Sequence, residues 1–238
     1  MKYSKKIKLS IVVPIFNEKE TLPILLKRIS SVALPDIQME IILIDDGSSD
    51  GTGQFLDTLV GNDLYRVITH TKNRGKGAAI RSGFNVAQGD IILIQDADLE
   101  YDPKEYPMLI APILEGYADV VYGSRFVTTH PRRALYFFHD FANKLLTFFS
   151  NLLTGLNITD MEVGYKVFKR DAICDIIPKL TANGFNIEPE LTSYVAKYNL
   201  RLYEVGISYH GRTYMEGKKI YWHDGLKALW YIIRYNLF

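Results

Sequence analysis

Ile91-Ile-Leu-Ile-Gln-Asp96-Ala-Asp98 is the stretch that best indicates how the chain is organised. Its four leading residues are apolar, which predicts a buried strand that is too short to be a helix. Two carboxylates spaced i, i+2 follow, and on an extended chain this spacing points both side chains to one face. Oxygen ligands of this kind suit Mg²⁺ or Mn²⁺ bridging to substrate phosphates. Taken alone, however, an Asp-x-Asp pair is better explained by a polar loop.

The composition is that of an ordinary globular protein. The chain has 238 residues, of which 47% are hydrophobic and 23% charged, enough for one large domain with a sizeable core. The formal net charge is +1, so the overall charge does not favour nucleic-acid binding. The single cysteine, Cys174, excludes an internal disulfide and a cysteine metal cluster.

No stretch of the sequence predicts a targeting or membrane-spanning segment. Residues 1–8 are basic but lack the apolar core of a signal peptide. The longest weakly polar stretch, residues 145–159, is too short to cross a bilayer comfortably. We therefore expect a cytoplasmic protein with no membrane span of its own. Peripheral contact with the cytoplasmic face of a membrane stays open.

Strands and helices alternate through the first half of the sequence. This alternation predicts an α/β fold with a largely parallel sheet and crossover helices. Strands are expected at residues 9–16, 39–44, 66–70, 91–95 and 119–122, and helices at about 17–34, 78–87 and 106–114.

Each predicted strand is followed by a polar loop rich in glycine, asparagine or aspartate. In open α/β sheets, ligands bind outside the carboxyl ends of the strands. These loops should therefore meet at one edge of the sheet, although they lie far apart in the sequence. They are Asn17-Glu18, Asp45-Asp46, Asn73 to Gly77, Asp96-Ala-Asp98 and Gly123-Ser-Arg125.

After Arg125 the sequence changes character. Residues 132–154 are rich in Phe and Leu, with polar residues recurring every three or four positions, which predicts a helix with one polar stripe. Such a helix is either buried on most sides or lies in a membrane interface, and periodicity alone favours burial. We further expect a strand at 164–169, helices at 171–177 and 188–198, and an extended stretch at 202–209. A last helix at 225–235 should be N-capped by Asp224 and place Trp230, Ile232 and Ile233 in the core.

Five short motifs, taken together and in order, carry a family resemblance. Each is weak alone, but their order and spacing are specific, and the match covers nearly the whole chain. They are Val13-Pro14-Ile-Phe16-Asn17-Glu18, Asp45-Asp46-Gly-Ser-Ser-Asp50-Gly-Thr52, Lys72-Asn73-Arg-Gly75-Lys-Gly77-Ala, Asp96-Ala-Asp98 and Gly123-Ser124-Arg125. The set resembles the family 2 glycosyltransferases with the GT-A fold. Within them it resembles the dolichyl- and polyprenyl-phosphate sugar synthases of the dolichyl-phosphate mannose synthase type.

The resemblance implies a fold and a domain organisation. The fold would be the α/β GT-A (nucleotide-diphospho-sugar transferase) fold, with a mostly parallel central sheet flanked by helices. One glycosyltransferase domain would span residues 1–238. Its first half, to about residue 125, would bind the nucleotide, and its second half, from about 126, would bind the acceptor and carry the C-terminal helix.

The resemblance also implies a donor site. Asp96 and Asp98 would hold Mg²⁺ or Mn²⁺, which stabilises the charge on a leaving diphosphate. Lys76 lies in a glycine-flanked loop that could approach phosphate, although an exposed surface lysine explains it as well. The family's Arg-(five residues)-Lys pattern matches Arg212 and Lys218, which would form a loop over the diphosphate. The residues expected to bind the nucleotide sugar are Pro14, Phe16, Glu18, Ile44, Asp46, Lys76, Asp96, Ala97, Arg212 and Lys218.

The later motifs concern the acceptor and catalysis. Arginine binds phosphate with a bidentate fork, so Arg125, Arg132 and Arg133 are expected to bind an anionic acceptor. Asp160-Met-Glu162-Val-Gly164-Tyr-Lys only partly matches the family's Asp-x-x-Ser-Gly-Phe-Arg segment. Asp160 is therefore a candidate site residue and Glu162 a weaker one. The residues expected to act in catalysis are Asp98, Arg125, Asp160 and Arg212.

The implied reaction is inverting transfer of a hexose to a polyprenyl or dolichyl phosphate, from a donor of the GDP-mannose or UDP-glucose type. A phosphate acceptor is already ionised at neutral pH and needs no general base, whereas a hydroxyl acceptor needs one. Family 2 enzymes acting on hydroxyls commonly carry a late carboxylate pair, for which Glu188 and Glu190 are the nearest substitutes. The lipid phosphate is therefore favoured, and a sugar hydroxyl in polysaccharide or glycolipid synthesis stays as the alternative.

A lipid acceptor changes the interpretation of residues 132–154, for which interface and core are then equally good explanations. Some relatives carry C-terminal transmembrane helices, and without them a chain would bind a membrane surface peripherally or through a membrane-anchor partner. Two other function classes fit less well. A nucleotidyltransferase would carry an early glycine-rich basic loop, which residues 14–18 lack. A non-catalytic binder would not need Asp96, Asp98, Arg212 and Lys218 intact.

Overall fold

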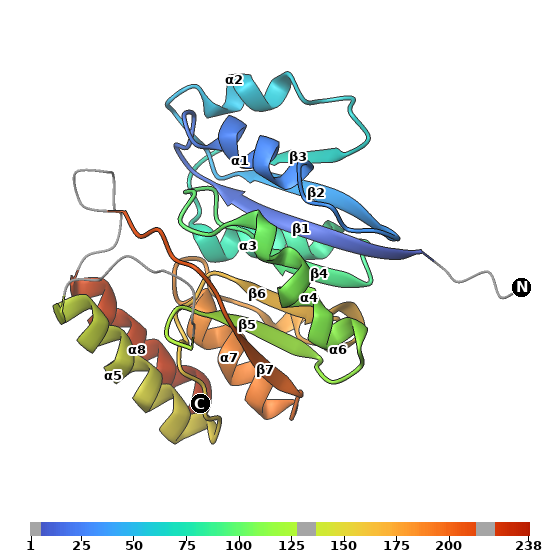
Figure 1. Ribbon diagram of the computed structural model, residues 1–238. Coiled ribbons are helices and arrows are strands. Elements are labelled where there is room, and N and C mark those ends of the chain that lie inside the picture. Colours follow the sequence, from blue (N-terminus) through green and yellow to red (C-terminus); the bar gives the residue numbers. More distant parts are fainter. Residues whose placement is uncertain (1–5, 128–136, 213–221) are drawn as a thin grey trace, which may run out of the picture.

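One sheet of seven strands runs through the molecule (Figure 1). The computed structural model describes residues 6–127, 137–212 and 222–238. The strands are β1 (Ile7–Ile15), β2 (Ile37–Asp45), β3 (Tyr65–Thr69), β4 (Ile91–Ile94), β5 (Val120–Ser124), β6 (Lys166–Lys169) and β7 (Leu202–Gly206). Their order across the sheet is β3-β2-β1-β4-β6-β5-β7.

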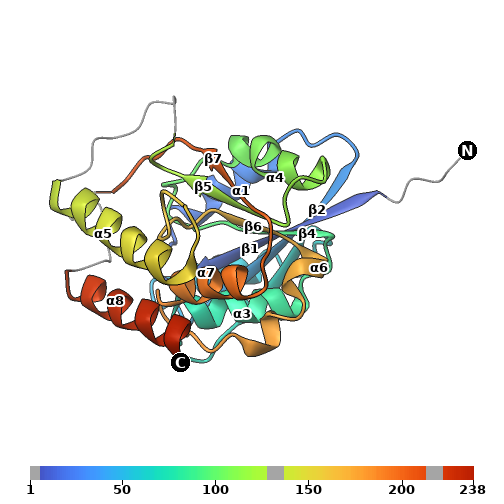
Figure 2. The same ribbon diagram turned by 90° about the horizontal axis from the view of Figure 1, so that it is seen from below.

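Helices cover both faces of this sheet. Figure 2 shows α1 (Leu22–Ser30) and α4 (Tyr106–Leu114) on one face, and α3 (Lys76–Val86) and α7 (Ile187–Lys197) on the other. α5 (Phe137–Thr154) and α8 (Trp222–Leu237) lie side by side and pack outside α7. The shorter elements are α2 (Thr52–Asp57), α6 (Arg170–Ile173) and the 3-10 turns η1 (Pro103–Glu105) and η2 (Ile177–Lys179).

The central strands are buried because helices lie on both of their faces. All residues of β4 are buried, as are Leu9 to Val13 of β1. A mainly parallel sheet covered in this way needs continuous apolar strands rather than alternating ones. The uninterrupted run Ile91-Ile-Leu-Ile therefore encodes a central strand, as the sequence predicted.

β6 is the exception to the parallel arrangement. It pairs antiparallel with β4 on one side and with β5 on the other, whereas the other neighbouring strands pair parallel. Because β6 runs the opposite way, the residues that precede it lie at the edge where the parallel strands end. Residues 160–165 therefore join the loops that follow β1, β2, β4 and β5 at that edge.

Several predicted helix boundaries were wrong. α1 spans Leu22–Ser30 rather than residues 17–34, because the residues around Glu18 bond to the loop after β2 instead of to a helix. α2 was not predicted, since it is short and begins after a glycine in the left-handed region, Gly51.

The last helix also departs from the prediction. α8 already includes Trp222 and His223, so Asp224 lies within the first turn and is not its N-cap. Ile232 is fully buried as expected, but Trp230 is 58% exposed. In the described part of the chain, every helix falls short of the length and apolar character that a bilayer crossing needs.

Candidate active site

A large cavity lies at the edge of the sheet where the parallel strands end. Its volume is about 1310 Å³, and side chains from both halves of the sequence line it. This exceeds the usual size of a small-molecule pocket. Most of the residues predicted to bind donor or acceptor lie on its wall: Pro14, Phe16, Glu18, Asp46, Lys76, Asp96, Ala97, Asp98, Arg125 and Arg212.

Lys76 bridges two carboxylates in the cavity wall. It begins α3, and its ammonium group lies 2.8 Å from Asp96 Oδ1 and 3.1 Å from Glu188 Oε1. The side chain is only 15% exposed, so it is not the surface lysine that the sequence left open. Burial alone would lower the pKa of Lys76, but Asp96 and Glu188 outweigh it and raise that pKa above its ordinary value. Lys76 therefore stays cationic beside Asp96.

Arg212 connects the end of the second half to two loops of the first half. Its Nη2 lies 3.2 Å from Glu18 Oε1 and 3.7 Å from Asp98 Oδ2. Glu100 holds Arg212 and Asp98, because its carboxylate accepts a hydrogen bond from the Arg212 backbone N–H at 2.7 Å and its own backbone N–H donates to Asp98 Oδ1 at 3.1 Å. The fold thus brings Glu18, Asp98 and Arg212 together on one wall.

Asp46 fixes the loop that precedes α3. Its carboxylate accepts hydrogen bonds from Arg74 N–H at 3.0 Å and Gly75 N–H at 2.6 Å, and Oδ1 lies 2.6 Å from His70 Nδ1. Gly75 has a φ of +96°, and a Cβ on it would lie 2.4 Å from the carbonyl oxygen of Asn183. Glycine is required there, so this loop lies tightly against Asn183. No motif in the sequence signals His70 or Asn183, whose roles depend on distant partners.

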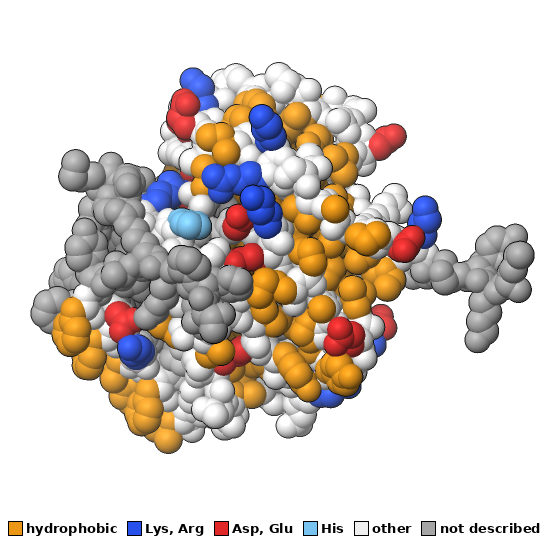
Figure 3. Space-filling view, viewed as in Figure 1, with side chains coloured by type: hydrophobic (Ala, Val, Ile, Leu, Met, Phe, Trp, Pro, Cys, Tyr) orange, Lys and Arg blue, Asp and Glu red, His pale blue; other side chains and the backbone are white. Residues whose placement is uncertain are grey.

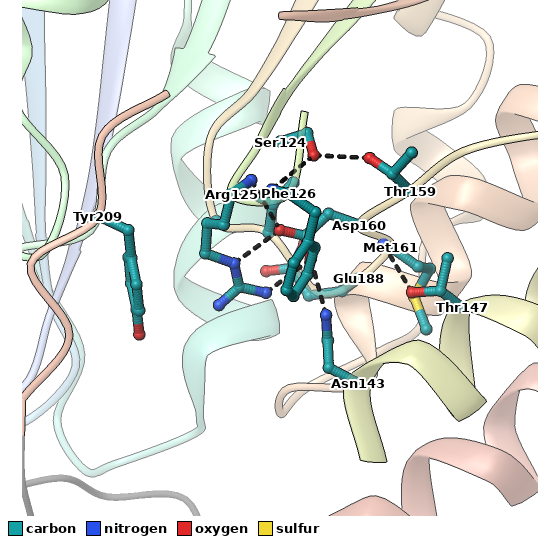
Figure 4. A network of polar contacts seen from close by, with 12 residues as sticks. Ser124, Arg125, Phe126, Asn143, Thr147, Thr159, Asp160, Met161, Glu188 and Tyr209 are labelled. Carbon is teal, nitrogen blue, oxygen red and sulfur yellow. Dashed lines mark hydrogen bonds and ion pairs between the residues drawn. The ribbon is translucent and has the colours of Figure 1, made fainter. Parts of the chain in front are cut away.

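Arg125 forms an ion pair with the fully buried Asp160 in another part of the cavity wall (Figure 4). Arg125 Nε lies 2.6 Å from Asp160 Oδ2, and Nη2 lies 2.6 Å from Oδ1. Asn143 of α5 donates to the same carboxylate at 3.1 Å, and the Tyr209 ring lies 5.1 Å from the guanidinium carbon. Burial alone would lower the pKa of Arg125, but Asp160 outweighs it and raises that pKa well above its usual range. Arg125 is thus a fixed, permanent cation.

Two predicted residues do not reach the cavity surface. Asp160 is fully buried and does not line the cavity, but it holds two residues that do, Arg125 and Asn143. Ile44 is also fully buried in β2, because the sheet is covered by α3 there, so its predicted contact with the nucleotide is not supported. Arg132, Arg133 and Lys218 lie outside the described residues. Asn143 and Tyr209 were not predicted as site residues, although Asn143 belongs to the polar stripe noted in the sequence.

Glu188 and Glu190, the nearest substitutes for a general base, are both engaged. The two oxygens of Glu190 accept the backbone N–H groups of Thr181 and Ala182 at 2.8 and 2.9 Å. Glu188 Oε2 accepts from the buried ammonium group of Lys166 at 2.5 Å. Glu190 is thus a structural residue, and Glu188 belongs to a network of ion pairs.

Within the described residues, Glu162 has neither the lysine contacts of Glu188 nor the backbone hydrogen bonds of Glu190. It lines the cavity, and its buried Oε1 has no hydrogen-bond partner in the described ranges. Burial, and then the charge of Glu188, raise the pKa of Glu162 to about 7. Glu162 was predicted only as a weaker site candidate, because the segment around it only partly matches the family pattern.

Asp96 and Asp98 fit a divalent metal whose coordination is completed by substrate phosphates. Their side chains are 17% and 26% exposed, and both line the cavity. Residues 6–127, 137–212 and 222–238 contain no group of three His, Cys, Asp or Glu suited to enclose a metal. Mg²⁺ is commonly held by one or two carboxylates plus substrate phosphates, which is what this pair offers.

The family model described as Glycosyl transferase family 2 matches residues 10–176. The undecaprenyl-phosphate 4-deoxy-4-formamido-L-arabinose transferases of Proteus mirabilis (strain HI4320) and Yersinia enterocolitica serotype O:8 are each 37% identical, over 174 and 177 residues. These matches cover 72% and 73% of this chain but 52% of each relative. The chain therefore spans about half the length of the curated relatives it matches.

Solved structures with the same fold include glucosyl-3-phosphoglycerate synthase from Mycobacterium tuberculosis. Its complex with Mn²⁺, UDP and phosphoglyceric acid has a TM-score of 0.70 and 19% identity, covering 97% of this chain and 79% of that chain. Its complex with Mg²⁺ and UDP gives the same TM-score, identity and coverage. The likeness shows that the fold is the predicted GT-A fold. The cavity wall from the loop after β1 to residues 160–164 lies inside the range matched by the family model, and the chain belongs to glycosyltransferase family 2.

Proposed function

We propose that this chain transfers a hexose from a nucleotide sugar to a polyprenyl phosphate, with inversion at the anomeric carbon. The observation that carries the proposal is one cavity with two kinds of wall. Asp96 and Asp98 lie beside Lys76 on one wall, and on the other wall the cation Arg125 is held by the buried Asp160. The first wall suits a metal-bound diphosphate and the second an anionic acceptor. The names of the curated relatives, undecaprenyl-phosphate sugar transferases, support this acceptor class.

The first half of the chain would bind the donor. Pro14 and Phe16 offer apolar surface for a base, and Glu18 offers oxygens for ribose hydroxyls. Asp46 would act mainly by holding the loop at Gly75 against the diphosphate, because its carboxylate is already occupied by backbone N–H groups. Donors of the GDP-mannose and UDP-glucose types both suit this arrangement.

Asp96 and Asp98 would hold Mg²⁺ or Mn²⁺ together with the donor phosphates. Bound there, the metal would neutralise the charge that develops on the leaving diphosphate. Lys76 and Arg212 border the same two carboxylates and would face the same phosphates. The Mn²⁺ and Mg²⁺ complexes of the M. tuberculosis structure support a divalent metal.

The second half, from about residue 126, would bind the acceptor together with Arg125. An oxygen of the lipid phosphate would attack the anomeric carbon in line while the bond to the nucleoside diphosphate breaks. The attacking phosphate is already ionised, so no general base is needed. Arg125 would orient it through the positive charge of its guanidinium group, and Arg132 and Arg133 are proposed to assist.

A sugar hydroxyl is the second candidate acceptor, and one observation favours it. Glu162 is a cavity carboxylate whose pKa is raised to about 7 and whose Oε1 has no partner within the described residues, as a general base requires. The two candidates predict different behaviour of Glu162→Gln. The substitution should abolish transfer to a hydroxyl and spare transfer to a phosphate.

The test of the proposed function starts with the donor. Thermal unfolding is measured with UDP-glucose, GDP-mannose, UDP and GDP, each with Mn²⁺ or with EDTA. A true donor raises Tm by mass action, and we expect the increase to be larger with Mn²⁺. The donor so identified, radiolabelled in the sugar, is then incubated with undecaprenyl phosphate in detergent. We expect the label to appear in the organic phase. Transfer of the label only to soluble sugar acceptors would instead show that the acceptor is a hydroxyl group and not a phosphate.

We also propose that the outer face of α5 lies in the lipid headgroup region of a membrane. Phe141, Phe148 and Leu152 recur at helical spacing and are 55%, 58% and 67% exposed. Figure 3 shows hydrophobic side chains along this side of the molecule. The opposite side of α5 carries Asn143, which lines the cavity. A lipid phosphate whose chain stays in the bilayer would therefore reach Arg125 past this helix.

Vesicles of phosphatidylethanolamine and phosphatidylglycerol test this placement. We expect the protein to sediment with them, and Phe148→Glu or Leu152→Glu to release it into the supernatant. Val60→Glu is the matched control, because Val60 is 69% exposed near α2, far from α5. If the wild type does not sediment, or if the three variants behave alike, the membrane proposal fails while the transferase proposal stands.

A further inference from the structure

Residues 160–164 connect the two charged walls of the cavity. At one end Asp160 Oδ1 lies 2.6 Å from Arg125 Nη2. At the other end Gly164 lies against Asp96, so closely that a Cβ on it would be 2.2 Å from Oδ2. Glu162 is in the middle of this segment and lines the cavity. Its carboxyl group is therefore presented between the two walls.

A buried lysine holds the backbone on both sides of Glu162. Lys166 is fully buried, and its ammonium group donates to the carbonyl oxygens of Met161 and Val163 at 2.9 and 2.5 Å. The side chains of Met161 and Val163 are themselves fully buried. Glu162 is thus a cavity-facing side chain on a rigid frame, and a residue so held is suited to selective binding.

The carboxyl group of Glu162 has hydrogen-bonding capacity that the described residues do not use. Its Oε1 is buried without a partner among them, and such an atom lowers stability unless something else binds it. The neighbouring cations are engaged elsewhere, Lys166 with Glu188 and Arg125 with Asp160. A ligand group that donates a hydrogen bond would satisfy the oxygen.

The transferred sugar has to lie between the two walls. Its anomeric carbon is bonded to the diphosphate beside Asp96 and is attacked by the phosphate beside Arg125. We propose that Glu162 is a specificity-determining residue that hydrogen-bonds a hydroxyl group of the transferred sugar and disfavours sugars that carry a carboxylate. The proposal rests on the proposed function, from which it takes the positions of the two phosphates. A uronic acid would bring its carboxylate close to Glu162 and Glu188, and like charges repel at short range.

Isothermal titration calorimetry with Mn²⁺ tests this inference. UDP-glucose, UDP-glucuronate and UDP are titrated into the wild type, Glu162→Gln and Glu162→Ala, with the GDP-mannose, GDP-mannuronate and GDP series run in parallel. Glu115→Ala, which removes an exposed glutamate after α4, is the control. The Tm of each variant is measured to verify that it is folded.

We expect the wild type to bind the neutral sugar nucleotide at least tenfold more tightly than the uronate. In Glu162→Gln the ratio of these two affinities should be smaller. Glu162→Ala should weaken binding of the neutral sugar nucleotide roughly tenfold, the effect of losing one strong hydrogen bond, and leave the nucleoside diphosphate unchanged. Glu115→Ala should change nothing.

Three results would overturn the inference. Equal weakening of sugar nucleotide and nucleoside diphosphate in Glu162→Ala would make Glu162 merely structural. Unchanged ratios in both Glu162 variants would mean that it does not contact the sugar. Unchanged donor binding with loss of turnover in Glu162→Gln would make it a general base. A wild type that binds no nucleotide at all would instead remove the proposed function itself.

Discussion

Arg125 and Asp160 form a largely buried ion pair with two hydrogen bonds, and Arg201 and Asp119 form a pair with the same geometry at the surface. The Arg125–Asp160 pair joins Nε to Oδ2 and Nη2 to Oδ1, both at 2.6 Å, and Asp160 is fully buried. Arg201 and Asp119 make the same two bonds at 2.9 and 2.8 Å, with the Arg201 side chain 54% exposed. The same arginine–aspartate pair can therefore be compared in a largely buried and in an exposed environment.

Asp160→Asn should destabilise the protein strongly. It leaves the guanidinium of Arg125, whose side chain is only 12% exposed, without a counter-charge, and breaking a largely buried pair in this way costs about 3–5 kcal/mol. Asp119→Asn breaks the matching surface pair, where water replaces the lost partner, and should cause a much smaller loss. Urea unfolding of both variants measures the difference. Similar losses would mean that the Arg125–Asp160 pair is not effectively buried.

Asp98→Asn should remove the dependence of donor binding on the metal. The substitution keeps the shape of the side chain but removes the charge that a divalent cation needs. We expect the extra Tm increase that Mn²⁺ gives with UDP-sugar or GDP-sugar to disappear, and transfer to fall by roughly 10²–10³. Asp57→Asn, at an exposed aspartate at the end of α2, is the control. A normal rate of transfer in Asp98→Asn would show that this carboxylate does not hold a metal.

Gly164→Ala should disturb Asp96 without adding a charge or a polar group. A Cβ at Gly164 would lie 2.2 Å from Asp96 Oδ2, so the carboxylate has to move. We expect weaker Mn²⁺-dependent donor binding and a lower Tm. Gly53→Ala makes the same chemical change in α2, where the Cβ would meet its nearest neighbour at 3.4 Å. It should be neutral or slightly stabilising, because alanine favours a helix. Equal effects at the two sites would contradict the close approach.

Glu162 should make stability depend on pH. Its pKa rises from an ordinary value of 4.5 to about 7 in the folded protein, through burial and then Glu188, with Lys166, Arg125 and Asp160 also facing it. Between these values the folded state binds more protons than the unfolded state, so this contribution is present at low pH and is lost as the pH rises to 7.

Glu162→Gln removes that contribution. Relative to the wild type, the variant should therefore gain about 1–3 kcal/mol of unfolding free energy between pH 4.5 and 8. Urea titrations of both proteins across this range measure the difference, and other titrating groups cancel in it. A constant difference would show that Glu162 ionises as it does in the unfolded chain.

Local sequence patterns predicted most of the sheet. The apolar run at Ile91 and the polar loops after the strands encode burial and chain reversal within a few residues. The reversed direction of β6 was not predicted, because Lys166–Lys169 carries no local mark of whether its neighbours run parallel or antiparallel. α2 and the true start of α8 were missed for the related reason that local patterns leave helix boundaries uncertain by a few residues.

Those parts of the candidate site that depend on a single loop could be predicted from the sequence. Asp96, Asp98 and Lys76 lie on the cavity wall because each lies at the end of a regular element, or just beyond it, at the edge of the sheet. The pairing of Arg125 with Asp160 depends on two loops 35 positions apart, and no spacing rule connects them. Ile44 shows the converse, since a residue beside a binding motif can be wholly buried.

Because β6 runs in the opposite direction, the edge of the sheet that carries the candidate site is built from two separate parts, and each could be replaced without the other. The residues proposed to bind the nucleotide follow β1, β2 and β4, whereas residues 160–164 precede β6, which runs in the opposite direction to β4. Replacing residues 160–164 with the corresponding segment of another family member would change the residue at position 162 and leave the proposed nucleotide-binding residues unchanged. Changing the sugar preference would then require replacing one short segment, while the residues proposed to bind the nucleotide stay the same.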